Sequence, residues 1–119
     1  MKFISLQHIS IEDPGTFKDF LLEDGHSITT IQLDEGDSIP NNLDEFDAML
    51  CMGGPMDTFM EDQYPWLVAE KKAIGEYVLN LKKPFLGFCL GCQLLGEVLG
   101  GKVVESKPPE IGVLDINIE

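Results

Sequence analysis

The sequence has 119 residues, which is enough for one domain and too few for two. Eight lysines, with no arginine, stand against 21 acidic residues, and the resulting net charge of −13 disfavours binding to nucleic acids or anionic membranes. No apolar run approaches the roughly 18 residues of a membrane span, and three cysteines cannot all pair within one chain, so we expect a cytoplasmic protein with free thiols.

The first part of the chain predicts two strands separated by a short helix. Residues 2–7 form an apolar run typical of a buried strand, and residues 28–33 are rich in β-branched side chains. Residues 16–23 fit a helix with a buried face made of Phe17, Phe20 and Leu21. The acidic stretch 34–45 contains a proline and predicts a surface loop.

The middle of the chain repeats this alternation. Residues 46–52 predict a third strand, and apolar residues at helical spacing predict a helix over 66–82. A fourth strand over 84–88 leads directly into a helix over 90–99, which a pair of glycines ends. Near-continuous apolar strands alternating with helices indicate an α/β domain, in which helices cover both faces of a parallel sheet.

The last part of the chain predicts two more strands. Residues 102–105 form a short apolar run, and residues 111–118 alternate as a half-exposed antiparallel strand does. The sequence stops inside this pattern, so we expect residues 1–119 to be a single incomplete domain, truncated before its C-terminal part. An uncovered sheet edge invites pairing with another chain, and we therefore expect a homo-oligomer.

Two glycine-rich motifs fall at the carboxyl ends of predicted strands, where parallel sheets bind their ligands. They are Gly53-Gly54-Pro55 and Gly87-x-Cys89-x-Gly91, and we expect them to face the same crevice. The second has the pattern of a nucleophile elbow, in which flanking glycines make room for a strained turn. Cys89 would then lie at a helix N-terminus, which favours the thiolate. The amides of Leu90 and Gly54 would be the donors to an oxyanion.

The same stretch allows other interpretations of its cysteines. Cys89 and Cys92 form a Cys-x-x-Cys pair, which could serve a thiol redox function, and buried structural thiols are common. Cys92 is expected to pack within an apolar helix, which disfavours redox chemistry. Zinc needs about four ligands, and we expect neither a metal nor another cofactor.

The segment from Gly87 to Leu95, followed by two glycines, resembles the signature of class I (triad) glutamine amidotransferases. The MGGPM sequence from Met52 resembles the oxyanion loop of that family, and both ends of the chain resemble its subgroup related to the amidotransferase domain of GMP synthase. The resemblance implies a flavodoxin-like sheet and hydrolysis of the side-chain amide of L-glutamine. It also implies a synthetase domain or subunit that accepts the ammonia.

Carried over by this resemblance, Cys89 is the catalytic nucleophile, and the Gly54 and Leu90 amides hold the oxyanion. Gly53 and Gln93 would bind the substrate.

The family completes its triad with a downstream His-x-Glu, and the sequence ends before that region. His8 and His26 are interpreted as surface or turn residues, and neither replaces the missing base. We therefore expect a weak or inactive glutaminase from this chain alone. The alternatives are a non-catalytic amidotransferase-like binding module and a redox protein using Cys89 and Cys92.

Overall fold

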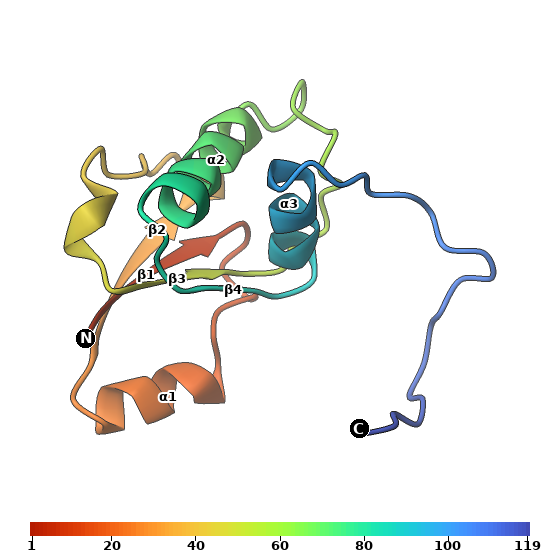
Figure 1. Ribbon diagram of the computed structural model, residues 1–119, viewed down its shortest axis with the longest axis horizontal. Helices are drawn as coiled ribbons and strands as arrows, with labels where there is room; N and C mark the ends of the chain where they lie inside the picture. Colours follow the sequence, from red (N-terminus) through yellow and green to blue (C-terminus); the bar gives the residue numbers. More distant parts are fainter.

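A four-stranded parallel sheet forms the centre of the computed structural model, which describes all 119 residues (Figure 1). Its strands lie in the order β2-β1-β3-β4, and their bounds are Lys2–Gln7 (β1), Ser27–Gln32 (β2), Ala48–Cys51 (β3) and Phe85–Gly87 (β4). All neighbouring pairs are parallel. The predicted α/β class is confirmed. Strand β1 has the predicted bounds, β2 begins and ends slightly earlier, and β3 and β4 are shorter at both ends.

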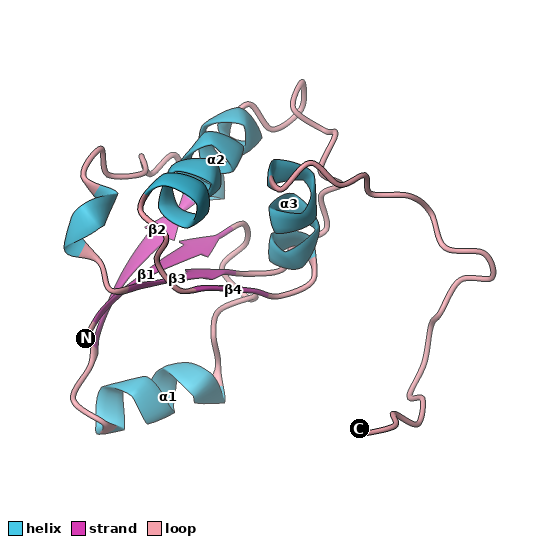
Figure 2. Cartoon of the chain, in the orientation of Figure 1, coloured by secondary structure: helices cyan, strands magenta, loops and turns pink.

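Helices cover both faces of this sheet (Figure 2). Helix α1 (Thr16–Glu23) lies on one face, and helices α2 (Trp66–Gly75) and α3 (Leu90–Val98) lie on the other. The helix predicted over 66–82 continues beyond α2 as a π-helical turn, Glu76–Asn80. The predicted loop over 34–45 contains two single-turn 3₁₀ helices, Leu33–Glu35 and Leu43–Glu45. None of the helices is long and apolar enough to cross a bilayer.

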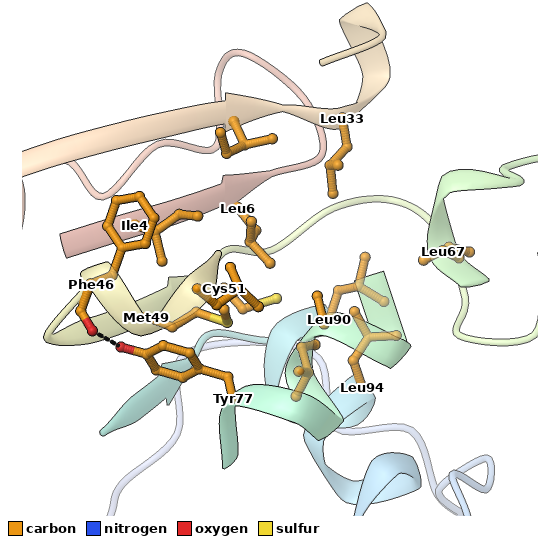
Figure 3. Close-up of a cluster of buried hydrophobic side chains, with 14 of the residues drawn as sticks. Ile4, Leu6, Leu33, Phe46, Met49, Cys51, Leu67, Tyr77, Leu90 and Leu94 are labelled. Atoms are coloured by element: carbon orange, nitrogen blue, oxygen red, sulfur yellow. Dashed lines mark hydrogen bonds between the residues drawn. The ribbon is translucent and has the colours of Figure 1, made fainter. Parts of the chain in front are cut away.

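The main hydrophobic core fills the space between the sheet and helices α2 and α3 (Figure 3). Alternate residues of β1, such as Ile4 and Leu6, point into this core because successive strand side chains face opposite sides. Tyr77 is fully buried there, and its hydroxyl donates a hydrogen bond to the Phe46 carbonyl at 2.9 Å. Leu90 and Leu94 of α3 are also buried, so the core fixes the helix that follows Cys89.

The opposite face of the sheet is less completely covered. Of the three apolar residues predicted to be buried by α1, only Leu21 is buried, while Phe17 and Phe20 are 38% and 60% exposed. The prediction for these two phenylalanines is therefore wrong. Helix α1 is the only helix on its face, and it has no neighbouring helix against which they could pack.

The two strands predicted at the end of the chain are not formed. Residues 102–105 and 111–118 have no strand structure, and their apolar side chains are largely exposed, with Ile111 at 90% and Ile118 at 91%. Figure 1 shows this segment leading away from the sheet after α3. The sequence pattern there is apolar enough for pairing, but a strand also needs a partner whose backbone groups it can bond, and no strand lies beside it.

Candidate active site

The turn between β4 and α3 holds Cys89 in an unusual backbone conformation. Its φ of 48° and ψ of −105° make it one of two non-glycine residues with positive φ, and it immediately precedes the first residue of α3. Such a conformation costs about 1–3 kcal/mol and is retained where the surrounding structure imposes it. Cys89 is a free and exposed thiol. The predicted strand–turn–helix elbow is therefore present.

The two glycines that flank Cys89 are required by close packing. A Cβ atom at Gly87 would lie 2.6 Å from both the Cys92 nitrogen and the Gly91 carbonyl carbon. A Cβ atom at Gly91 would overlap the carbonyl oxygen of Cys51 in β3. Since all of these atoms belong to the backbone, no side-chain movement could relieve the contacts, and the elbow needs glycine at both positions.

The Gly53-Gly54 loop lies directly against this elbow, as predicted. A Cβ atom at Gly53 would be 3.6 Å from the Cβ of Cys89, and one at Gly54 would be 3.3 Å from Cδ2 of Leu90. Neither the Gly54 amide nor the Leu90 amide donates a hydrogen bond to another group of the protein. The two segments that meet at Cys89 therefore each carry a backbone donor with no partner in the protein.

Gln93 and Cys92 lie on the first turns of α3. The Gln93 amide donates to the Cys89 carbonyl at 3.1 Å, and its side chain is exposed. Cys92 is also an exposed free thiol, so the prediction that it packs within the helix is wrong. Helix α3 buries only the face that carries Leu90, Gly91 and Leu94, and Cys92 lies outside that face.

His8 departs furthest from its predicted role. The sequence predicts a surface residue, but His8 is fully buried at the carboxyl end of β1. Its Nδ1 is 2.9 Å from the Gly53 carbonyl oxygen, and its Nε2 is 2.7 Å from Oε1 of Glu70 in α2. Burial lowers the pKa of His8, but hydrogen bonding and charge from Glu70 outweigh it, so the pKa is raised. Both ring nitrogens are thus engaged away from Cys89.

Glu70 is a further residue of this site, and its position in the sequence gives one indication of its burial. It falls three residues after Leu67 and four before Ile74, on the stripe of α2 that faces the core. A carboxylate on such a stripe indicates a buried partner, because an unpaired charge is costly inside a protein. The partner is His8, which carries no periodic signal of its own.

The only cluster of three possible metal ligands contains His8, Glu70 and Cys51, whose donor atoms lie within 4.8 Å of one another. Cys51 donates to Oε1 of Glu70 at 3.3 Å. Burial, followed by the charge and hydrogen bond of Glu70, raises the pKa of the Cys51 thiol well above its usual value. Cys51 is therefore a neutral thiol, and the cluster is held together by hydrogen bonds among its own members.

A polar network fixes the loop that follows Gly54. Thr58 donates to Glu97 of α3 at 2.6 Å, and Lys71 of α2 lies 3.0 Å from Glu97 and 2.8 Å from Glu61. Burial raises the pKa of Glu97, but the hydrogen bonds from Thr58 and Lys71 lower it more strongly. The loop is thereby tied to both helices beside the elbow.

The remaining histidine lies at the other end of the sheet. His26 precedes β2 and is hydrogen-bonded to the N-terminal amine at 3.1 Å. In a parallel sheet, the start of β2 is opposite to the carboxyl end of β4, where Cys89 lies. Of the two histidines in the chain, His8 is engaged below the glycine loop and His26 is remote, so neither supplies a base to Cys89.

Comparison with known proteins places this arrangement in context. Residues 17–118 match the sequence profile of the family described as glutamine amidotransferase class-I. The glutamine amidotransferase-like protein YfeJ of Salmonella typhimurium is 34% identical over 114 residues, which are 93% of this chain and 47% of YfeJ. A glutamine-hydrolysing GMP synthase subunit of Sulfurisphaera tokodaii is 40% identical over 79 residues, covering 64% of this chain and 37% of the other protein.

Comparison of the fold with solved structures also finds glutamine amidotransferases. The crystal structure of a glutamine amidotransferase from Methylobacillus flagellatus superimposes with a TM-score of 0.84 at 32% identity, over 93% of this chain and 43% of that one. The chain thus spans less than half the length of the relatives it matches.

Proposed function

Because the chain belongs to the class-I glutamine amidotransferase family, we propose that it contributes the nucleophile and the oxyanion donors for hydrolysis of the side-chain amide of L-glutamine. One observation supports this proposal: the exposed thiol of Cys89 sits on a strained turn that lies against the Gly53-Gly54 loop, and the Gly54 and Leu90 amides donate no hydrogen bond within the protein. A thiol used only for packing would need neither the strained backbone nor the two free donors.

In the proposed reaction, the Cys89 thiolate attacks the amide carbon of glutamine and forms a carbon–sulfur bond. The amide oxygen becomes an oxyanion, to which the Gly54 and Leu90 amides donate hydrogen bonds. The carbon–nitrogen bond then breaks, the nitrogen takes up a proton, and ammonia leaves a γ-glutamyl thioester on Cys89. Water cleaves the thioester to give glutamate and the free thiol. Gly53 and Gln93 are proposed to contact the bound glutamine beside Cys89.

The leaving nitrogen needs a proton donor and the attacking water needs a base, and neither histidine of this chain supplies such a group. We propose that a further segment of a longer protein, or a separate protein, provides these groups, and that a synthetase domain or subunit receives the ammonia.

The three cysteines are free thiols, which suits a protein of the reducing cytosol. We also propose a homo-oligomer, since residues 111–118 expose several apolar side chains, and light scattering that gives a clean monomer at micromolar concentration would refute it.

The test is covalent labelling with a diazo-ketone analogue of glutamine, followed by mapping of the adduct by mass spectrometry. Its ketone oxygen takes the place of the amide oxygen, and its reaction with a thiol releases dinitrogen. An adduct at Cys89 that L-glutamine suppresses is the expected result. No adduct at Cys89, in a chain whose Cys89 still reacts with iodoacetamide, would refute the proposal and favour a non-catalytic binding module.

A second candidate function is thiol redox chemistry, which the exposure of Cys92 favours. A reversible disulfide between Cys89 and Cys92, with a potential in the range of cytosolic redox proteins, would support that function.

A further inference from the structure

The Gly53-Gly54 loop rests on a buried imidazole. His8 has no exposed surface, and its Nδ1 lies 2.9 Å from the Gly53 carbonyl oxygen. On its other side, Nε2 lies 2.7 Å from Oε1 of Glu70, which is also fully buried. The ring stacks on Trp66 with a centroid separation of 5.4 Å and an interplanar angle of 22°. Contacts from the loop and from α2 therefore fix the position of the ring.

The partners of the ring determine where its protons are. A carbonyl oxygen can only accept a hydrogen bond, so Nδ1 must carry a proton and donate it to Gly53. Oε1 of Glu70 accepts a bond from the Cys51 thiol and also lies 2.7 Å from Nε2, so Glu70 holds the ring from the side opposite to Gly53. Glu70 and Glu12 both raise the pKa of His8 against the effect of burial.

The bond to Gly53 has a consequence for Gly54 because the two residues share one peptide unit. In a trans peptide, the carbonyl of one residue and the amide N–H of the next point in opposite directions. The only cis peptide of the chain is elsewhere, before Pro108. When His8 draws the Gly53 oxygen into the protein, the Gly54 N–H is directed away from the interior.

Without such a restraint, this peptide could turn over. Glycine adopts both negative and positive φ angles at little cost, and here two glycines flank one peptide bond. A turned peptide would present a carbonyl oxygen to the site, which repels an oxyanion instead of stabilising it. The hydrogen bond from His8 to the Gly53 oxygen thus disfavours the turned peptide, in which a carbonyl oxygen would face the oxyanion.

We propose that His8, oriented by Glu70, is a positioning residue that locks the Gly53–Gly54 peptide with its N–H directed toward the oxyanion formed at Cys89. This inference rests on the proposed function, because the direction of the Gly54 amide matters only if that amide stabilises the oxyanion. His8 itself touches neither the substrate nor the sulfur of Cys89.

Two substitutions at one position separate the two bonds of the ring. In His8→Asn, the side-chain amide nitrogen can take the place of Nδ1 and keep the bond to Gly53. In His8→Gln, the amide nitrogen can take the place of Nε2, so that the bond to Glu70 is kept and the bond to Gly53 is lost. Both variants thus carry a side-chain amide, but only His8→Asn keeps the hydrogen bond to the Gly53 carbonyl.

Both variants are treated with the diazo-ketone analogue and, separately, with iodoacetamide. We expect His8→Gln to slow the analogue's reaction at Cys89 by about tenfold or more, toward the roughly 10²–10³-fold effect of removing an oxyanion donor. His8→Asn should stay within about threefold of the wild type, because its donor to Gly53 is retained. The iodoacetamide rate at Cys89 should not change in either variant, since that reaction displaces iodide without forming an oxyanion.

Nuclear magnetic resonance detects the hydrogen bond from His8 to the Gly53 carbonyl independently of any reaction. We expect a proton bonded to His8 Nδ1 in the wild type, and a Gly53 carbonyl carbon shift that changes in His8→Gln and is retained in His8→Asn. If the wild type shows these signals but its Cys89 ignores the analogue, the proposed function fails while the hydrogen bond to Gly53 stands.

Two results would overturn the inference. The first is a His8→Gln variant whose Gly53 shift and labelling rate both equal those of the wild type. The second is labelling of the buried Cys51 by iodoacetamide together with slower labelling of Cys89, which would show that His8 acts through general stability.

Discussion

Replacing Gly91 by alanine tests how closely α3 must approach β3. The added Cβ would lie 2.7 Å from the Cys51 carbonyl carbon and 3.0 Å from the Cys51 Cβ, and it would overlap the Cys51 oxygen. Carbon atoms pack best at about 3.5–4.0 Å, so the helix would have to retreat by roughly 1 Å. Overpacking of this kind destabilises a protein by about 1–3 kcal/mol, and we expect Gly91→Ala to lower the free energy of unfolding by that amount.

Gly96 provides a matched control on the same helix. A Cβ at Gly96 meets nothing within 4 Å, so Gly96→Ala should raise the free energy of unfolding by about 0.5–1 kcal/mol through helix propensity alone. Urea unfolding followed by circular dichroism gives both values, and the two variants should differ by about 1.5–4 kcal/mol. Equal midpoints for the two variants would refute the close contact between α3 and β3.

Three further predictions concern single side chains. Cys92→Ser should leave the labelling of Cys89 by the glutamine analogue unchanged, whereas loss of labelling would favour a function that uses both thiols. Glu70→Ala should lower the free energy of unfolding by about 3–5 kcal/mol because it leaves His8 without its buried partner. Glu70→Gln should lower it by less, and equal urea midpoints for the two variants would contradict a stabilising contact between His8 and Glu70. Burial, with the charges of Asp47 and Asp44, raises the pKa of Tyr77 from 10.0 to about 12, so its contribution to the pH dependence of stability begins above pH 10. Because the neutral phenol is favoured in the folded state, unfolding becomes easier as the pH rises from 10 toward 12. Tyr77→Phe should flatten the decline of the unfolding free energy over that range, and an unchanged decline would contradict the assignment.

The elbow could be predicted from the sequence because its determinants are local. A strand, a turn with two flanking glycines and a helix follow one another within a few residues, and Gly87 and Gly91 have the close contacts expected of them. The meeting of the Gly53-Gly54 loop with Cys89 could also be predicted, since the carboxyl ends of parallel strands share one edge.

The features that the sequence did not reveal depend on contacts between distant parts of the chain. His8 and Glu70 are 62 residues apart, and nothing near His8 in the sequence shows that its ring is buried against α2. The exposure of Phe20 and Cys92 depends on which faces of α1 and α3 have neighbours. Residues 111–118 have a strand pattern, but pairing requires a second strand beside them.

Protection of Cys89 by glutamine tests the central claim most directly. The chain is incubated with the diazo-ketone analogue in the presence of rising concentrations of L-glutamine or, as a matched control, D-glutamine, and the labelled fraction of Cys89 is read by mass spectrometry. We predict that L-glutamine suppresses the label on Cys89 in a saturable way and that D-glutamine does so weakly. Labelling of Cys89 that is insensitive to both enantiomers would contradict a glutamine site at this elbow.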